Sequence, residues 1–132
     1  MLDLGNKFIK KSFLVYGFGK TGKACFDYLK KNNLVLIFDD NEKKIPLKYK
    51  KYIFKKNINN KFDYIVLSPG INIKNCGLKK IINNNNNKII TDLDIFYLNN
   101  PNNFTIAITG SNGKSTTAKL LFDILKKNKK EA

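Results

Sequence analysis

Residues 12–22 of the 132-residue chain read Ser-Phe-Leu-Val-Tyr-Gly-Phe-Gly-Lys-Thr-Gly, and this segment indicates the fold class. The apolar run Ser12–Tyr16 predicts a short buried strand that stops at a glycine. Residues 20–31 then predict a helix. The expected buried stripe of that helix consists of Ala24, Cys25, Tyr28 and Leu29. A strand, a glycine-rich turn and a helix in this order form the unit from which parallel α/β sheets are built.

The turn between strand and helix has the pattern G-x-G-x-x-G, with glycines at positions 17, 19 and 22. Gly17 permits a tight turn, Gly19 lets backbone approach a pyrophosphate, and Gly22 allows close packing of helix on strand. About twenty residues further on, Asp39 ends the next apolar run, where it can accept hydrogen bonds from a ribose or a base. The spacing indicates a Rossmann-type phosphate-binding turn. The alternative role for Asp39 is that of a solvated carboxylate at a strand end.

The rest of the chain alternates apolar runs with helical patterns. We expect further strands at 34–38, 52–54, 64–67 and 88–90, and helices at 78–82 and 92–98, the latter capped by Thr91. Continuous apolar strands separated by helices favour an α/β fold with a Rossmann-like parallel sheet covered on both faces. The polar, turn-rich residues 99–103 mark the expected boundary between a first domain, 1–98, and the start of a second, 99–132.

A second glycine-rich stretch reads Gly110-Ser111-Asn112-Gly113-Lys114-Ser115-Thr116. It follows the apolar run 104–108, which predicts a buried strand, and precedes a helical pattern at 118–127. Backbone N–H groups of such a turn and the following helix N-terminus bind phosphates. Lys114 is placed to reach the β- and γ-phosphates of ATP, and Ser115 to ligate Mg²⁺. Ile108 replaces the usual first glycine of the pattern G-x-x-x-x-G-K-[ST].

The amino-acid composition limits the kinds of binding partner that we expect. The formal net charge of +15 comes from lysine alone, and the lysines are scattered in pairs among abundant Asn, Ile and Phe, as an AT-rich coding sequence favours. Arginine, the preferred reader of guanine edges, is absent, so we expect no nucleic-acid partner. No run approaches membrane-spanning length, so no membrane partner is expected either. The chain has no histidine, and Cys25 and Cys76 lack metal-ligand spacing. A cytoplasmic monomer is the expectation.

The chain contains two phosphate-binding turns, and in this it resembles the Mur ligase family of peptidoglycan synthesis. The motifs that carry the resemblance, in chain order, lie at residues 17–22, 36–39, 68–71 (Ser-Pro-Gly-Ile), 92–96 (Asp-Leu-Asp-Ile-Phe) and 109–116. The pairs Ser111-Asn112 and Ser115-Thr116 resemble the branch of the family that adds D-glutamate. The missing first glycine at Ile108 is also typical of this family.

The resemblance implies two ligand sites. Uridine diphosphate of UDP-N-acetylmuramoyl-L-alanine would be bound by Gly17, Gly19, Lys20, Thr21, Gly22, Asp39 and Gly70. ATP would be bound by Gly110, Ser111, Asn112, Gly113, Lys114, Ser115 and Thr116. Within the second set, Lys114 would be catalytic by stabilising the γ-phosphoryl group, and Ser115 would hold Mg²⁺. In this family ATP phosphorylates the substrate carboxylate, and the amine of D-glutamate attacks the acyl-phosphate.

Two departures from the family pattern qualify these expectations. Asp40 and Asn41 replace a pair whose second member is often arginine, so the resemblance does not extend to the uracil contacts of that pair. Ligases of the family have roughly three domains of ~150 residues. We therefore expect this chain to be an N-terminal fragment or a truncated gene product that does not ligate by itself, without the remaining Mg²⁺ ligands and the D-glutamate domain.

Two other functions fit part of the sequence. A nicotinamide-binding regulatory or redox domain would use residues 17–22 and Asp39 but would leave residues 110–116 unexplained. A generic P-loop NTPase would use the second stretch and leave the first unexplained.

Overall fold

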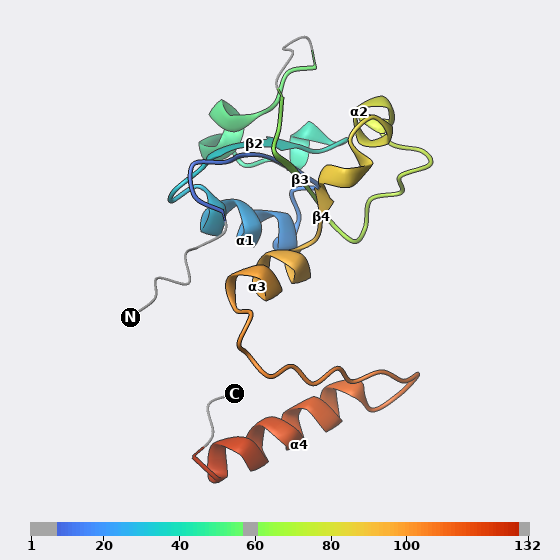
Figure 1. Cartoon of the computed structure of the whole chain (residues 1–132). Coiled ribbons are helices and arrows are strands. Elements are labelled where there is room, and N and C mark those ends of the chain that lie inside the picture. The colour runs from blue at the N-terminus through green and yellow to red at the C-terminus, as the bar shows by residue number, and fades with distance from the viewer. Residues whose placement is uncertain (1–7, 57–60, 130–132) are drawn as a thin grey trace. The chain divides into compact units, whose positions relative to one another are not determined.

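The computed structural model describes residues 8–56 and 61–129 and divides the chain into two compact units, Met1–Pro101 and Asn102–Ala132. The strands and all helices but the last belong to the first unit, and the last helix belongs to the second (Figure 1). The division falls inside the polar segment 99–103.

The first unit is built on a four-stranded parallel sheet with the strand order β2-β1-β3-β4. The strands are β1 (Ser12–Tyr16), β2 (Leu34–Phe38), β3 (Tyr64–Leu67) and β4 (Ile89–Ile90). The parallel α/β sheet expected from the sequence is thus confirmed. Tyr16 pairs with Phe38 on one side and with Leu67 on the other, so three strands end at the same level. The residues that follow these strands therefore share one edge of the sheet.

Both faces of the sheet are covered. Alternate residues of β1 point to opposite faces, and Phe13, Leu14, Val15 and Tyr16 are all fully buried. Phe13 and Val15 pack in one cluster with α1 (Lys20–Leu29), and Leu14 and Tyr16 pack in the other with α2 (Lys79–Asn83). Burial of both faces explains why the strands are continuous apolar runs rather than alternating ones.

The third helix, α3 (Asp92–Asn99), begins at the expected cap. The Thr91 hydroxyl accepts a hydrogen bond from the Asp94 N–H at 3.3 Å, and the Asp94 carboxylate accepts one from the Thr91 N–H at 2.7 Å. This reciprocal pair satisfies two backbone donors that the first helical turn would otherwise leave free. The cap predicted at Thr91 is confirmed.

The buried stripe of α1 differs from the expected one. Ala24 and Tyr28 are exposed. The buried positions are Gly22, Cys25, Phe26 and Leu29. These positions have the spacing i, i+3, i+4, i+7 of one helix face, and that face is rotated from the expected one so that it meets the sheet.

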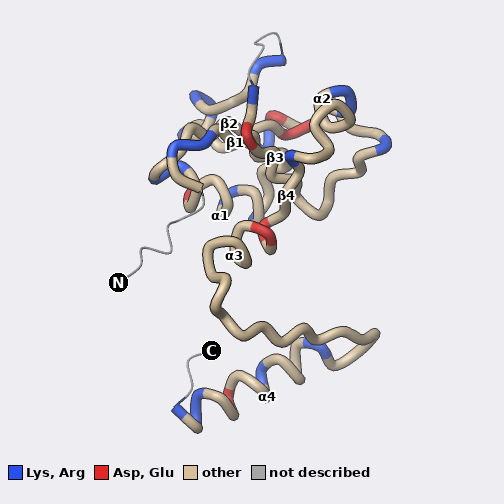
Figure 2. Tube along the Cα trace, viewed as in Figure 1, with Lys and Arg blue, Asp and Glu red and all other residues tan. Residues whose placement is uncertain are grey.

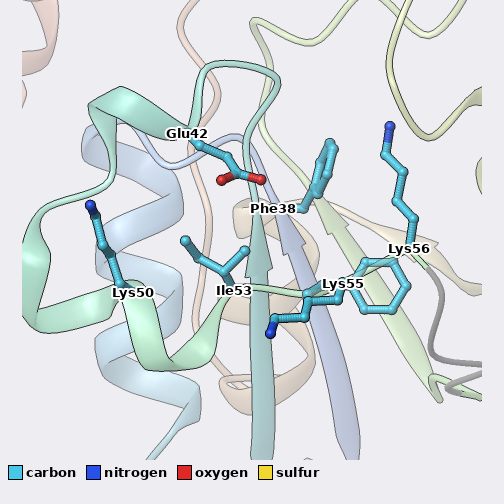
Figure 3. Close-up of a pocket in the computed structure, with 7 residues that line it drawn as sticks. Phe38, Glu42, Lys50, Ile53, Lys55 and Lys56 are labelled. Atoms are coloured by element: carbon cyan, nitrogen blue, oxygen red, sulfur yellow. The ribbon is translucent and has the colours of Figure 1, made fainter.

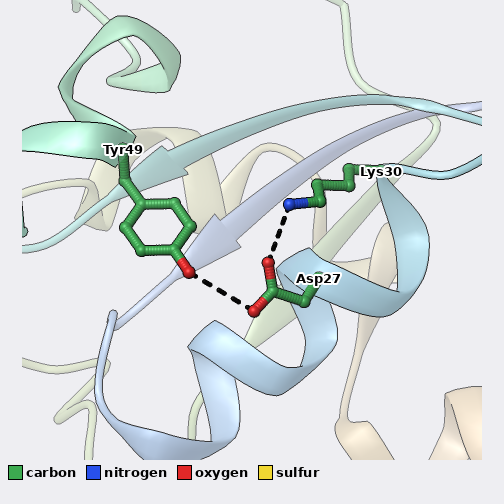
Figure 4. A network of polar contacts seen from close by, with 3 residues as sticks. All are labelled: Asp27, Lys30 and Tyr49. Atoms are coloured by element: carbon green, nitrogen blue, oxygen red, sulfur yellow. Dashed lines mark hydrogen bonds and ion pairs between the residues drawn. The ribbon is translucent and has the colours of Figure 1, made fainter.

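A small polar network ties α1 to the 3₁₀ helix Leu47–Tyr52 (Figure 4). The Asp27 carboxylate accepts hydrogen bonds from Lys30 Nζ at 2.9 Å and from the Tyr49 hydroxyl at 3.3 Å. The hydrogen bond from Lys30 is the main reason why the pKa of Asp27 is lowered. The strand expected at 52–54 is reduced to a single parallel bridge between Ile53 and Ile37, because residues up to Tyr52 coil into this 3₁₀ helix.

The second unit contains α4 (Lys114–Lys127), which starts directly after Gly113 and four residues before the expected start. The strand expected at 104–108 is not formed, and Phe104 is 91% exposed. The described part of this unit contains no strand with which residues 104–108 could pair. Their N–H and C=O groups therefore have no partners in a β-ladder. Leu120 and Ile124 of α4 are exposed, and Leu121 is half-buried.

Lysines are distributed over both units rather than gathered on one element (Figure 2). Within residues 8–56 and 61–129, no helix combines the length and the apolar character needed to cross a membrane.

The contact between Gly22 and Gly17 predicts a sharp difference between two glycine substitutions. A Cβ at Gly22 would lie 1.8 Å from the Gly17 carbonyl oxygen, whereas a Cβ at Gly19 would meet nothing within 4 Å. We expect Gly22→Ala to lower the free energy of unfolding by at least about 2 kcal/mol, because backbone atoms must separate. Gly19→Ala, the matched control, should change it by less than about 0.5 kcal/mol. Urea unfolding followed by circular dichroism measures both, and equal effects would contradict this packing.

Candidate functional site

The glycine turn lies at the edge of the sheet where β1, β2 and β3 end. Gly17 has φ +90°, a conformation that favours glycine, and its N–H donates to the Phe38 carbonyl at 2.8 Å. Gly19 is the N-cap residue of α1 and is exposed. The N–H groups of the first helical turn have no acceptor inside the helix. Open space at Gly19, next to the positive end of a helix dipole, suits an anionic ligand.

Side chains from the two neighbouring strands contact this turn. Ser68, which follows β3, donates a hydrogen bond from Oγ to the Gly17 carbonyl at 2.9 Å. Asp39, which follows β2, accepts one from the Phe18 N–H at 2.7 Å through Oδ2. Its other oxygen accepts from the Asn41 N–H at 2.9 Å. The structure therefore brings the glycine turn, Asp39 and the loop after β3 together at one edge.

Asp40 has a different set of partners. Its carboxylate accepts hydrogen bonds from the Tyr16 hydroxyl at 2.6 Å and from the Gly77 N–H at 2.9 Å. Burial is the main cause that raises the pKa of Tyr16 well above its usual range, and the contacts with Asp40 and Cys76 add to it. Asp40 thus joins the ends of β1 and β2 to the loop that follows β3. Sequence reasoning missed this role, because only the fold places Gly77 beside Asp40.

The remaining residues predicted for the first site have accessible positions. Lys20 and Gly70 are exposed and Thr21 is half-buried. A Cβ at Gly70 would meet nothing within 4 Å, so the surface there is open. Sequence reasoning did not assign a role to Ser68, although its place in the Ser-Pro-Gly-Ile motif beside the predicted Gly70 was a signal that could have found it.

The predicted ATP loop, residues 110–116, is an exposed turn at the start of α4. Gly110 and Gly113 have φ +145° and +76°, and the first hydrogen bond of α4 runs from the Thr117 N–H to the Gly113 carbonyl at 2.9 Å. The N–H groups of residues 114–116 are thus free of helical acceptors. Lys114 Nζ donates to the carbonyls of Gly110 and Ser111. A glycine turn, a helix N-terminus and this ammonium group fit a polyphosphate.

A pocket of about 490 Å³ lies beside the end of β2 and shares no residue with either predicted site (Figure 3). It is lined by Phe38, Glu42, Lys50, Ile53, Phe54, Lys55 and Lys56. The ammonium group of Lys56 lies 5.1 Å from the centre of the Phe38 ring. The lysines that line it are exposed side chains.

The environment of Cys25 does not suggest a reactive centre. Burial raises the pKa of the Cys25 thiol to about 11, so the thiol stays protonated at neutral pH. Both cysteines are free. Among the described residues, no group of three or more metal-binding side chains of the types His, Cys, Asp and Glu comes together.

The sheet and the glycine turn together are typical of one kind of domain. A parallel sheet with a glycine turn between β1 and α1, and with a carboxylate after β2, is a Rossmann-like domain of the kind that binds nucleotide phosphates. The family model described as "Mur ligase MurD-like, N-terminal domain" matches residues 11–90. The chain therefore belongs to this family of MurD-like Mur ligases.

Curated relatives agree with this assignment. The chain is 34% identical to the UDP-N-acetylmuramoylalanine–D-glutamate ligase of Rickettsia prowazekii, over 93% of the chain and 29% of that relative. It is 38% identical to the ligase of the same name from Rickettsia bellii (90% of the chain, 28% of the relative). It is 34% identical to the ligase of the same name from Wolbachia pipientis (92% of the chain, 25% of the relative). The chain thus spans between a quarter and three tenths of the length of these relatives. No solved structure matches.

The contact between Tyr16 and Asp40 predicts an energetic coupling. Asp40→Ala removes an acceptor from a buried hydroxyl, which costs about 1–3 kcal/mol of unfolding free energy. In a Tyr16→Phe background the same change should cost at least about 0.5 kcal/mol less, because the hydroxyl is already gone. Urea unfolding of the wild type, both single variants and the double variant measures this coupling as a double-mutant cycle. Strictly additive effects would show that the hydrogen bond contributes nothing to stability.

Proposed function

We propose that the chain is the N-terminal part of an ATP-dependent ligase that adds D-glutamate to UDP-N-acetylmuramoyl-L-alanine. In this proposal residues 17–22 and Gly70 form the site for the uridine diphosphate, with Asp39 beside them. The observation that carries the proposal is the glycine turn itself. It has an open position at Gly19 and a free helix N-terminus, and it lies within the stretch that the MurD-like family model matches.

Residues 110–116 form the proposed ATP loop. Since 93% of the chain aligns with the relative from Rickettsia prowazekii, the alignment passes residue 90 and includes this loop. Bound ATP would supply a phosphoryl group for the substrate carboxylate. The N–H groups of residues 114–116 would hold the phosphate oxygens, and the Ser115 hydroxyl would serve as a ligand of Mg²⁺. Lys114 would leave the carbonyls of Gly110 and Ser111 and place its ammonium group against the γ-phosphoryl charge.

The expected ligands also indicate the compartment in which the protein acts. UDP-linked precursors and ATP are cytosolic metabolites, so we propose a cytoplasmic protein. The two free cysteines are compatible with a reducing compartment.

Binding measurements on the chain separate this proposal from the alternatives. We expect UDP-N-acetylmuramoyl-L-alanine to bind at least about tenfold more tightly than NADH, with ATP binding independently of both. Parallel calorimetric titrations with the three ligands measure this. Tighter binding of NADH would support a nicotinamide-binding domain instead, and binding of ATP alone would support a generic P-loop protein.

Substitution of one residue in each loop tests whether the two loops bind different ligands. Gly19→Val should abolish binding of the UDP compound, because a branched side chain would fill the open position at Gly19. Lys114→Ala should leave that binding unchanged, since this lysine belongs to the other loop. In a ligase of full family length, Lys114→Ala should also remove most ATP-dependent acyl-phosphate formation. Normal ligation by the lysine variant would refute the role given to Lys114.

A further inference from the structure

The contacts at the glycine turn converge on one peptide group, the one that joins Gly17 to Phe18. Its carbonyl oxygen accepts the hydrogen bond from Ser68 Oγ at 2.9 Å, and its N–H donates to Asp39 Oδ2 at 2.7 Å. Ser68 follows β3 and Asp39 follows β2, so the two side chains come from strands on either side of β1. We propose that Asp39 and Ser68 are positioning residues that clamp this peptide group and so hold the turn in the shape that binds a nucleotide diphosphate.

The geometry explains why this peptide group needs a clamp. Gly17 at φ +90° has no side chain that would resist rotation of the peptide that follows it. Its own N–H is fixed by the Phe38 carbonyl, and the Phe18 ring is buried, with its centre 4.9 Å from that of Tyr49. The chain is therefore anchored before and after the peptide plane. The two side-chain hydrogen bonds determine how the plane itself is turned, and with it the direction of the N–H groups that follow.

The clamp also sets the packing of the helix on the strand. A Cβ at Gly22 would lie 1.8 Å from the Gly17 carbonyl oxygen, so this oxygen lies close against α1. Ser68 Oγ binds the same oxygen and would lie 3.2 Å from that Cβ. If the peptide turned over, the oxygen would leave both neighbours, and a carbonyl dipole would take the place of an N–H group at the turn.

The charge of Asp39 argues for an indirect role. A carboxylate repels the phosphates of a diphosphate ligand, so its direct electrostatic effect on that part of the ligand is unfavourable. Each of its oxygens already accepts a backbone N–H group, from Phe18 and from Asn41. This inference rests on the proposed function and refines it: besides any contact with ribose or uracil, Asp39 affects the phosphate end of the ligand through the turn.

The test compares a ligand with phosphates and a ligand without them, using the whole 132-residue chain. Asp39→Ala and Ser68→Ala should each weaken UDP about tenfold, the usual effect of losing one charge-assisted or well-placed hydrogen bond. Ser68→Ala should bind uridine within about twofold of the wild type, because uridine does not use the turn, and Asp39→Ala should lose several-fold more affinity for UDP than for uridine. Asp39→Asn keeps an oxygen that can accept from the Phe18 N–H and should restore most of the UDP affinity. The double alanine variant should lose less than the product of the two single losses.

A matched control separates geometry from charge. Asp40→Asn removes the same charge one residue further along but leaves the Gly17–Phe18 peptide untouched, so UDP affinity should stay within about threefold. Equal losses of UDP and uridine affinity in Asp39→Ala would overturn the inference in favour of direct contact with ribose or base. Unchanged UDP affinity in either alanine variant, or independent losses in the double variant, would also overturn it.

Hydrogen exchange tests the clamp without any ligand. The Phe18 amide should exchange at least about tenfold faster in Asp39→Ala than in the wild type and in Asp40→Asn, because its acceptor is lost. Unchanged exchange would show that Asp39 does not hold this peptide. A wild-type chain that binds no UDP would contradict the proposed function, whereas the exchange experiment would still decide whether the clamp exists.

Discussion

The close approach of helix α1 to strand β1 determines how the edge of the sheet in the first unit is built. At Gly22 the helix touches the Gly17 carbonyl so closely that no side chain fits between them. This approach lets the helix begin directly at the end of the strand, with Gly19 as its cap. The free N–H groups of the helix then point to the same edge at which β2 and β3 end, because the three parallel strands finish in register. One backbone contact thus decides where a phosphate could bind.

The acidic pair after β2 shows how one strand end can serve two structural purposes. Asp39 turns toward the glycine turn and accepts from the Phe18 N–H, whereas Asp40 turns toward the Tyr16 hydroxyl and the Gly77 N–H. Consecutive residues of an extended chain point to opposite sides, so a pair of carboxylates can hold two neighbouring segments at once. Asp40 therefore offers a structural reason for an aspartate at a position where the sequence departs from the family pattern.

The sequence predicted the first unit well and the second less well, for physical reasons that differ. Strands β1, β2 and β3 have the predicted bounds, because burial on both faces produces unbroken apolar runs that end at glycine, aspartate or serine. The cap at Thr91 was equally predictable, since a capping box is local in sequence. The run 104–108 has the same apolar character but forms no strand, because a strand also needs a neighbour and the described part of its unit contains none. The roles of Ser68 and Asp40 depend on contacts between distant segments, which no local pattern contains.

The two glycine-rich turns also differ in how firmly their shapes are held. In the first, side chains after β2 and β3 reach the turn from both sides, so its backbone is oriented before any ligand arrives. Preorganised N–H groups need no rearrangement when an anion binds, which favours affinity. In the second, Lys114 donates to carbonyls of its own loop, and the described residues of its unit supply no neighbouring strand. A ligand of the second turn must therefore first draw Lys114 away from Gly110 and Ser111, and part of its binding free energy offsets that rearrangement. On this reasoning the first turn is the better-formed anion site of the chain.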